Sequence, residues 1–282
     1  MTLLSPTSVL ADAPVLHVDV AIVGGGPAGL MAADVLSQAG VSVHLFDAMP
    51  SVGRKFLLAG KGGLNLTHSE PSGLFNSRFG ARQPEVSQWL SGLDAQGVCA
   101  WAQALGVSTF VGSSGRIFPQ EMKAAPLLRA WLHRLRHPAS GVPVQFHMRH
   151  RWLGWQGDTL VFEPTGSAGV TRVNARATLL ALGGASWPRL GSDGAWAPVL
   201  AEQGIALAPL KPANCGFDVL GRAGQGWTEH FRSRFAGQPL KSVALRVEAT
   251  PGASPSGVAR FDRRGEFVIT DTGVEGSLVY AA

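Results

Sequence analysis

Residues 19–47 read DVAIVGGGPAGLMAADVLSQAGVSVHLFD, and this stretch determines the architecture. An apolar, β-branched run at residues 18–23 predicts a buried strand. Residues 24–29 carry the pattern G-x-G-x-x-G, and residues 30–38 predict a helix that starts directly after it. A second apolar run at residues 41–46 predicts another strand. This order of strand, glycine-rich turn, helix and strand predicts a Rossmann-like βαβ unit.

Each glycine of this pattern has a mechanical role. Gly24 turns the chain sharply out of the first strand, Gly26 lets the backbone approach a pyrophosphate, and Gly29 lets the helix pack closely on the strand. The start of the helix offers free N–H groups and a partial positive charge to the same pyrophosphate. Asp47 follows the second strand at a spacing from which a carboxylate reaches ribose hydroxyl groups. The stretch therefore predicts dinucleotide binding, although it does not separate FAD from NAD(P).

The composition is that of a folded globular protein with one large domain or two. The chain has 282 residues, of which 45% are hydrophobic and 15% are charged, and its net charge is +5. The basic balance suits anionic ligands such as dinucleotides, and it also leaves a nucleic-acid surface open. Cys99 and Cys215 form neither a C-x-x-C redox pair nor a zinc-binding set, so a dithiol mechanism has no support.

The sequence predicts a cytoplasmic protein that does not span a membrane. No apolar run reaches the ~20 residues that a bilayer-spanning helix needs. Residues 1–17 have no basic segment ahead of an apolar one, so they do not form a convincing signal peptide. We interpret them as a disordered leader.

A second glycine-rich segment, residues 50–68, follows Asp47 closely. It includes a basic pair, Arg54 and Lys55, which we expect near the phosphates of a dinucleotide bound at the first motif. Residues 59–65, AGKGGLN, have little side-chain bulk, so their backbone can approach a flat ring. The alternative interpretation of the segment is a surface loop with a solvated basic pair.

Three motifs together resemble a family of bacterial flavoproteins. They are GGGPAGLMAA at residues 24–33, GRKFLLAGKGGLNLTH at 53–68 and LLALGGASWPRLGSDGAW at 179–196. The family is that of NAD(P)/FAD-dependent oxidoreductases, also described as aminoacetone-oxidase-like, whose FAD domain is similar to that of glutathione reductase. Leu64 stands where many members have cysteine, and His68 stands where many have asparagine. Chemistry that depends on that cysteine is therefore not available to this chain.

The resemblance implies an α/β fold with a Rossmann-like FAD-binding domain, built on a parallel sheet with a β-meander crossover, plus an inserted, mostly β second domain. We assign the first domain to residues 18–205 and the second to residues 206–282. Within the first domain we expect a helical segment at about residues 85–136, with a turn at 115–119, and the β-meander at about residues 142–175.

The resemblance also implies that the chain is truncated at its C-terminus. Members usually continue past the position of Ala282 and return to the FAD domain with a final strand and a closing helix. We therefore expect the second domain to be incomplete and one side of the FAD domain to be left uncovered, which exposes apolar surface.

The expected cofactor is FAD. The sequence has no second G-x-G-x-x-G after a strand, so we expect no separate NAD(P)-binding domain. NAD(P)H could then serve only as an electron donor that binds transiently. We predict no metal site, and His68 is the single candidate for a catalytic group. The predicted cofactor-binding residues are Gly24, Gly26, Pro27, Ala28, Gly29, Asp47, Arg54, Lys55, Gly62, Gly63, Asn65, Leu66 and Gly183.

The predicted function is hydride transfer between the flavin and a small organic substrate. Contacts of Lys211, Asn214 and Lys241 with an acidic substrate are a further prediction, against the alternative that these are exposed side chains at strand edges. Two other functions stay open at this stage. One is a non-catalytic or decayed fragment that binds flavin or nucleotide. The other is a flavoenzyme that acts on nucleic acid, suggested by the basic balance alone.

Overall fold

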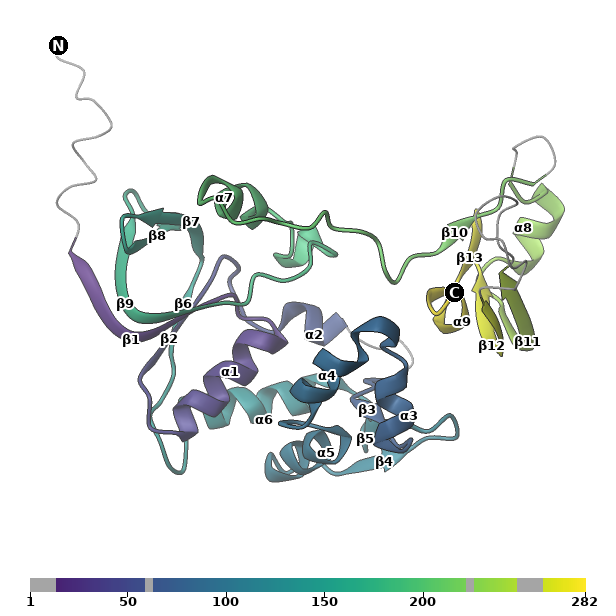
Figure 1. Ribbon diagram of the computed structural model, residues 1–282, viewed down its shortest axis with the longest axis horizontal. Helices are drawn as coiled ribbons and strands as arrows, with labels where there is room; N and C mark the ends of the chain where they lie inside the picture. The colour runs from purple at the N-terminus through teal and green to yellow at the C-terminus, as the bar shows by residue number, and fades with distance from the viewer. Residues whose placement is uncertain (1–13, 59–62, 222–225, 248–260) are drawn as a thin grey trace, which may run out of the picture. The chain divides into compact units, whose positions relative to one another are not determined.

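The computed structural model describes residues 14–58, 63–221, 226–247 and 261–282 (Figure 1). Contacts divide the chain into two compact units, residues 1–208 and 209–282, and each is described by itself. The α/β architecture with a Rossmann-like first unit confirms the predicted fold class. None of the helices in the described ranges has the length and apolarity that a bilayer-spanning helix needs.

A six-stranded mixed sheet forms the centre of the first unit. Its strand order is β6-β2-β1-β9-β8-β7, in which β6, β2, β1 and β9 run parallel and β8 and β7 are antiparallel to their neighbours. The parallel ladder confirms the βαβ unit that the glycine motif predicts. The strands are β1 (Val15–Val23), β2 (Val43–Asp47), β6 (Gln145–Met148), β7 (His150–Gln156), β8 (Thr159–Pro164) and β9 (Thr171–Leu180).

The first strand corrects the predicted leader. β1 begins at Val15 rather than at Val18, because Val15 and Leu16 pair in parallel with Arg172 and Val173 of β9. The last residues of the predicted leader are therefore part of the sheet. Residues 1–13 lie outside the described residues.

The predicted β-meander also needs correction. The stretch PVQFHMRHRWLGW, residues 143–155, is predicted as the first strand of this meander. It does not run as one strand, because Arg149 adopts a left-handed conformation, with φ of 61°, and separates β6 from β7. The Arg149 N–H donates to the Met49 carbonyl over 3.1 Å, which holds the corner. β6 therefore extends the parallel sheet beside β2, and only β7, β8 and β9 form the meander.

Two layers cover the sheet, and each has its own core (Figure 1). On one side, α1 (Pro27–Gln38) and α6 (Ala124–Arg136) bury Ile22, Leu45 and Trp131. On the other side, β7 and β8, at the far end of the same sheet, fold back over β2 and together with α7 (Trp196–Glu202) bury Phe46 and Phe162. The carboxyl ends of β1, β2 and β9 lie between these layers, where ligands bind in open α/β sheets.

The predicted helical segment contains strands that the sequence analysis missed. Its helices are α3 (Ser72–Ser77), α4 (Gln83–Leu90), α5 (Ala95–Ala104) and α6. Between α5 and α6, β4 (Thr109–Val111) and β5 (Arg116–Pro119) form a three-stranded sheet with β3 (Thr67–His68). The turn predicted at residues 115–119 was therefore wrong. Ile117 is buried in β5 and pairs with Thr67 and Val111, so tertiary pairing decides this segment.

The second unit is a four-stranded antiparallel sheet with two short helices, consistent with the prediction of a mostly β module. The sheet order is β10-β13-β12-β11. Lys211, Asn214 and Lys241 are exposed, and their proposed role in substrate binding stays a prediction. The elements are β10 (Phe217–Asp218), α8 (Glu229–Phe235), β11 (Pro239–Val247), β12 (Phe261–Ile269), β13 (Gly273–Glu275) and α9 (Ser277–Tyr280).

Three histidines and Phe46 form a cluster near one edge of the parallel sheet. The His147 ring stacks on Phe46 with centroids 4.3 Å apart, and its Nε2 lies 2.9 Å from Nδ1 of His44. The His150 ring lies edge-on to the rings of both Phe46 and His147. Burial, reinforced by the neighbouring His44 and His150, lowers the pKa of His147 to about 4.

This histidine should make the first unit sensitive to mild acid. Unfolded histidine titrates near pH 6.5, so between about pH 6.5 and 4 the unfolded state binds the proton that folded His147 refuses, and the free energy of unfolding falls. Because the ring is only half-buried, we expect a loss of about 1–2 kcal/mol over this window. Denaturant titrations at pH 7 and pH 4.5 measure it. The free energy of unfolding of a His147→Gln variant should fall less between these two pH values. An equal fall in the variant and the unmodified protein would contradict the assignment of the pH dependence to His147.

Candidate functional site

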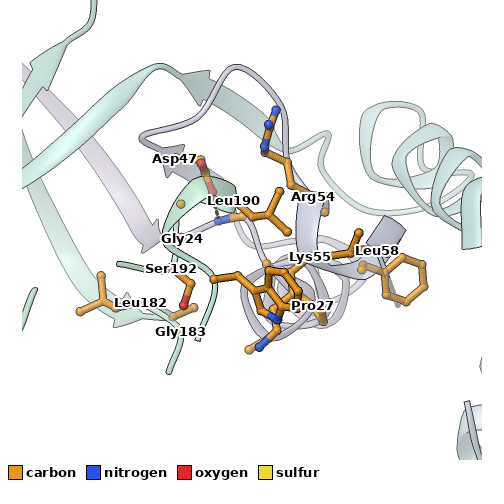
Figure 2. A pocket seen from close by; sticks show the side chains of 18 of the residues that line it. Gly24, Pro27, Asp47, Arg54, Lys55, Leu58, Leu182, Gly183, Leu190 and Ser192 are labelled. Atoms are coloured by element: carbon orange, nitrogen blue, oxygen red, sulfur yellow. Dashed lines mark hydrogen bonds between the residues drawn. The ribbon is translucent and has the colours of Figure 1, made fainter. Parts of the chain in front are cut away.

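A cavity of about 1160 Å³ opens at the carboxyl ends of the parallel strands in the first unit (Figure 2). It exceeds the range of about 300–1000 Å³ that is typical of pockets for drug-sized ligands, so it has room for a large one. Most of its lining is apolar. It draws on segments that are distant in sequence: residues 24–28, Asp47, residues 51–58, residues 64–66 and residues 180–200. We refer to it as the first cavity.

The glycine loop is held rigidly at one wall of this cavity. Gly24 has φ of 109°, and a β-carbon there would overlap the carbonyl of Ala181 in the segment after β9. The Gly24 N–H donates to the Phe46 carbonyl over 2.8 Å, and the Gly53 N–H donates to the Gly25 carbonyl over 2.8 Å. A β-carbon at Gly29 would overlap the Gly24 carbonyl, so Gly29 serves the packing of α1 on β1.

The start of α1 faces the first cavity and suits an anion. Gly26 is the N-cap, and no described side chain caps the helix or places an acid in its first turn. No described atom lies within 4 Å of the position that a β-carbon on Gly26 would take. Free N–H groups, the partial positive charge of the helix and an open approach at Gly26 are what a pyrophosphate requires.

Asp47, the last residue of β2, holds the glycine loop through its carboxylate. Its Oδ2 accepts the Gly25 N–H at 2.6 Å, and its Oδ1 accepts the Met49 N–H at 2.7 Å. Burial raises the pKa of Asp47, while these two donors and the charge of Arg54 act in the opposite direction. Each carboxylate oxygen has a second lone pair, so Asp47 can still accept a hydrogen bond from a ligand hydroxyl.

The basic pair lies on α2 (Arg54–Leu58), and both side chains line the first cavity. Lys55 Nζ donates to Ser186 Oγ over 2.6 Å, which ties α2 to the loop after β9 across 131 residues of sequence. Arg54 Nε is buried and has no hydrogen-bond partner among the described residues. A buried guanidinium N–H without a partner fits a phosphate oxygen as its missing acceptor.

The opposite wall comes from the segment after β9, and the sequence analysis missed most of it. Gly183, with φ of 76°, packs against Ser192, whose Oγ has no partner in the described part of the chain (Figure 2). Trp196 Nε1 is buried and equally unpartnered there. Trp187 and Leu190 add apolar surface. The W-P-R-L run after Gly184 was a usable signal, because large apolar residues beside turn residues are typical of a ligand wall.

Most of the predicted cofactor-binding residues come together at the first cavity. Gly29 instead packs α1 on β1, and Gly63 packs against Met122 and Phe118. Gly62 lies outside the described residues. The predicted residues that line the first cavity are Gly24, Gly26, Pro27, Ala28, Asp47, Arg54, Lys55, Asn65, Leu66 and Gly183.

His68, the predicted catalytic candidate, does not line the first cavity. It lies in β3, where its Nδ1 accepts the Glu70 N–H at 3.1 Å and its Nε2 donates to the Ser114 carbonyl over 3.0 Å. Both ring nitrogens are thus used within the protein. His68 lines a second cavity instead. No cluster of metal-ligating side chains occurs in the described ranges either.

Two solved structures share the fold. The open conformation of a flavocytochrome c3 fumarate reductase is 16% identical with a TM-score of 0.59, and the match covers 84% of this chain and 49% of that one. A quinol-fumarate reductase with menaquinol molecules is 16% identical with a TM-score of 0.53, covering 86% of this chain and 48% of that one. This chain therefore spans about half the length of each neighbour. No curated protein sequence matches the chain.

The sequence also matches a protein family along most of its length. The match runs over residues 18–279 and includes all three of the motifs described above. The family match and the flavoprotein fold together bear out the prediction of an FAD-binding Rossmann-like domain. The chain belongs to the family described as the HI0933-like protein Rossmann domain.

Proposed function

We propose that this protein is an FAD-dependent oxidoreductase that transfers a hydride between the flavin and a small organic substrate, as its resemblance to aminoacetone-oxidase-like flavoproteins suggests. One observation carries the proposal. The first cavity joins the glycine loop and Asp47 to the apolar residues that follow β9, within a volume that suits a dinucleotide. Apolar surface with a few convergent polar groups is the usual character of a cofactor site.

The residues of the first cavity divide by the chemistry that each can offer to FAD. The backbone from Gly24 to Ala28 would hold the pyrophosphate, with Arg54 Nε supplying a further donor. Asp47 would accept a ribose hydroxyl. Asn65, Leu66 and Gly183 would flank the ring system, where their small or apolar surfaces permit close approach.

The bound flavin would supply the redox chemistry, and the protein orients it and excludes water. Trp187, Leu190 and Leu200 line the first cavity with apolar surface and so favour a dry site. We propose NAD(P)H as a transient electron donor, and a small molecule rather than nucleic acid as the substrate. We propose a cytoplasmic location on the composition of the chain.

Cofactor content is the first property to measure. We expect the purified chain to show a flavin absorbance spectrum and to release FAD in about a one-to-one ratio, as a cavity with this motif requires. Chromatography of the heat-released cofactor separates FAD from FMN and nicotinamides. A colourless protein that also fails to take up added FAD would contradict the proposal.

Turnover separates an enzyme from a flavin-binding protein without activity. NADH and NADPH are mixed anaerobically with the flavin-loaded chain, and bleaching of the flavin absorbance reports hydride transfer. Bleaching followed by recovery in air supports an oxidoreductase. A stably bound flavin that neither nucleotide reduces, and that small amines and hydroxy acids also leave oxidised, favours the non-catalytic alternative.

A further inference from the structure

A second cavity, of about 700 Å³, lies within the helical segment of the first unit and shares no lining residue with the first cavity. Its walls come from residues 68–72, from Ile117 of β5 and from helices α3, α4 and α5, and Figure 1 shows where these elements lie. The function proposed above makes no use of it.

The charged groups of the second cavity are already satisfied by the protein. Glu70 forms a two-point ion pair with Arg78, with Nε to Oε1 at 2.6 Å and Nη2 to Oε2 at 2.7 Å. Asp94 caps α5 by accepting the Gly97 N–H at 2.8 Å. Both ring nitrogens of His68 are used within the protein, Nδ1 towards the Glu70 N–H and Nε2 towards the Ser114 carbonyl.

Anions are therefore disfavoured in the second cavity. Its lining contains two carboxylates, and Arg78, which balances one of them, is not part of the lining. An anionic ligand would meet these carboxylates, and the described residues of the lining include no lysine or arginine to pair with it, which costs free energy. A neutral ligand avoids this repulsion.

Two of the neutral hydrogen-bonding side chains in the lining have no hydrogen-bond partner among the described residues. The side chains of Asn76 and Ser87 are half-buried, and the described residues offer neither of them a hydrogen bond. Asn76 presents both an N–H donor and a carbonyl acceptor, which together match a primary amide. Phe75 and Leu90 supply an apolar wall beside them.

We infer that the second cavity binds a small neutral molecule that carries a primary amide on an apolar or aromatic body. Asn76 pairs with the amide, Ser87 adds a hydroxyl contact, and Phe75 and Leu90 pack against the apolar part. This site is distinct from the proposed FAD site and does not depend on it.

Cys99 makes the inference testable, because its free thiol lines the second cavity while the other free thiol, Cys215, belongs to the second unit. Iodoacetamide and iodoacetate carry the same iodomethyl group, but the first has a neutral primary amide where the second has a negatively charged carboxylate. With either reagent the thiolate sulfur displaces iodide, a C–S bond forms as the C–I bond breaks, and the thiol proton goes to the buffer. Peptide mass spectrometry gives the rate at each cysteine.

We expect the iodoacetamide-to-iodoacetate rate ratio at Cys99 to exceed the ratio at Cys215 by about tenfold. Nicotinamide should slow alkylation of Cys99 and not of Cys215, whereas nicotinate, its anionic counterpart of the same shape, should have no effect. Equal ratios at the two cysteines, or equal protection by the two competitors, would overturn the inference.

A matched pair of variants tests the role of Asn76. Asn76→Asp keeps the shape and replaces the amide with a third carboxylate, so it should abolish protection by nicotinamide. Asn174→Asp, the same change on an exposed residue of β9 that lines neither cavity, should leave protection intact. Protection that survives Asn76→Asp would contradict the assigned contact. Flavin content, measured on the same samples, separates failure of this inference from failure of the proposed FAD site.

Discussion

Replacing Gly26 with alanine is expected to remove most FAD binding from a chain that still folds. The backbone of Gly26, with φ of −77° and ψ of −177°, suits alanine, and no described atom lies within 4 Å of the new methyl group. That methyl group instead stands at the start of α1, where the pyrophosphate must come close to the backbone. The substitution therefore acts on the ligand and not on the fold.

Binding and stability must be measured together for this variant. We expect FAD affinity, followed by quenching of flavin fluorescence, to fall by at least about tenfold, while the melting temperature of the flavin-free protein falls by at most about 2–4 °C, the cost of replacing glycine with alanine at an N-cap. Gly73→Ala is the matched control, because Gly73 also has no described atom near a new β-carbon but lies in α3, outside the lining of both cavities. An unchanged FAD affinity in Gly26→Ala would place the pyrophosphate elsewhere.

Replacing Asp34 with asparagine is expected to lower the free energy of unfolding by about 3–5 kcal/mol. Asp34 is 1% exposed in the middle of α1. Its Oδ2 accepts hydrogen bonds from Trp131 Nε1 at 3.0 Å and from Trp101 Nε1 at 3.2 Å, and it pairs with Arg134. The variant leaves the Arg134 guanidinium, which is itself mostly buried, without a counter-charge.

Urea denaturation followed by tryptophan fluorescence measures this effect, since Trp101 and Trp131 report on the site directly. The control is Asp19→Asn, which breaks the exposed ion pair of Asp19 with Arg176 and should change stability by at most about 0.5 kcal/mol. Adding Arg134→Met to the Asp34 variant should recover part of the loss, because it removes the unpaired charge. Equal losses for the Asp34 and Asp19 variants would contradict the account.

Local sequence was enough to predict the parts of the fold that depend on local backbone geometry. The apolar runs around the glycine motif predicted β1, α1 and β2, because strand and helix periodicity is a property of neighbouring residues. The same reasoning failed at Arg149, whose left-handed conformation splits residues 143–155, predicted as one strand, into two. It also failed at Ile117, where pairing with two distant strands overrides a turn-like composition.

The sequence alone established the dinucleotide-binding motif, the order of its elements and most of the residues on one wall of the first cavity. Only the tertiary structure placed Ser192 and Trp196 on the opposite wall, joined Lys55 to Ser186, and moved His68 to a separate cavity. Only the tertiary structure showed that Asp34, a polar residue on an otherwise ordinary helix, is the buried acceptor for α5 and α6. The physical reason is that a glycine's conformation is set by its neighbours in the chain, whereas a side chain's partners depend on which distant segments pack against it.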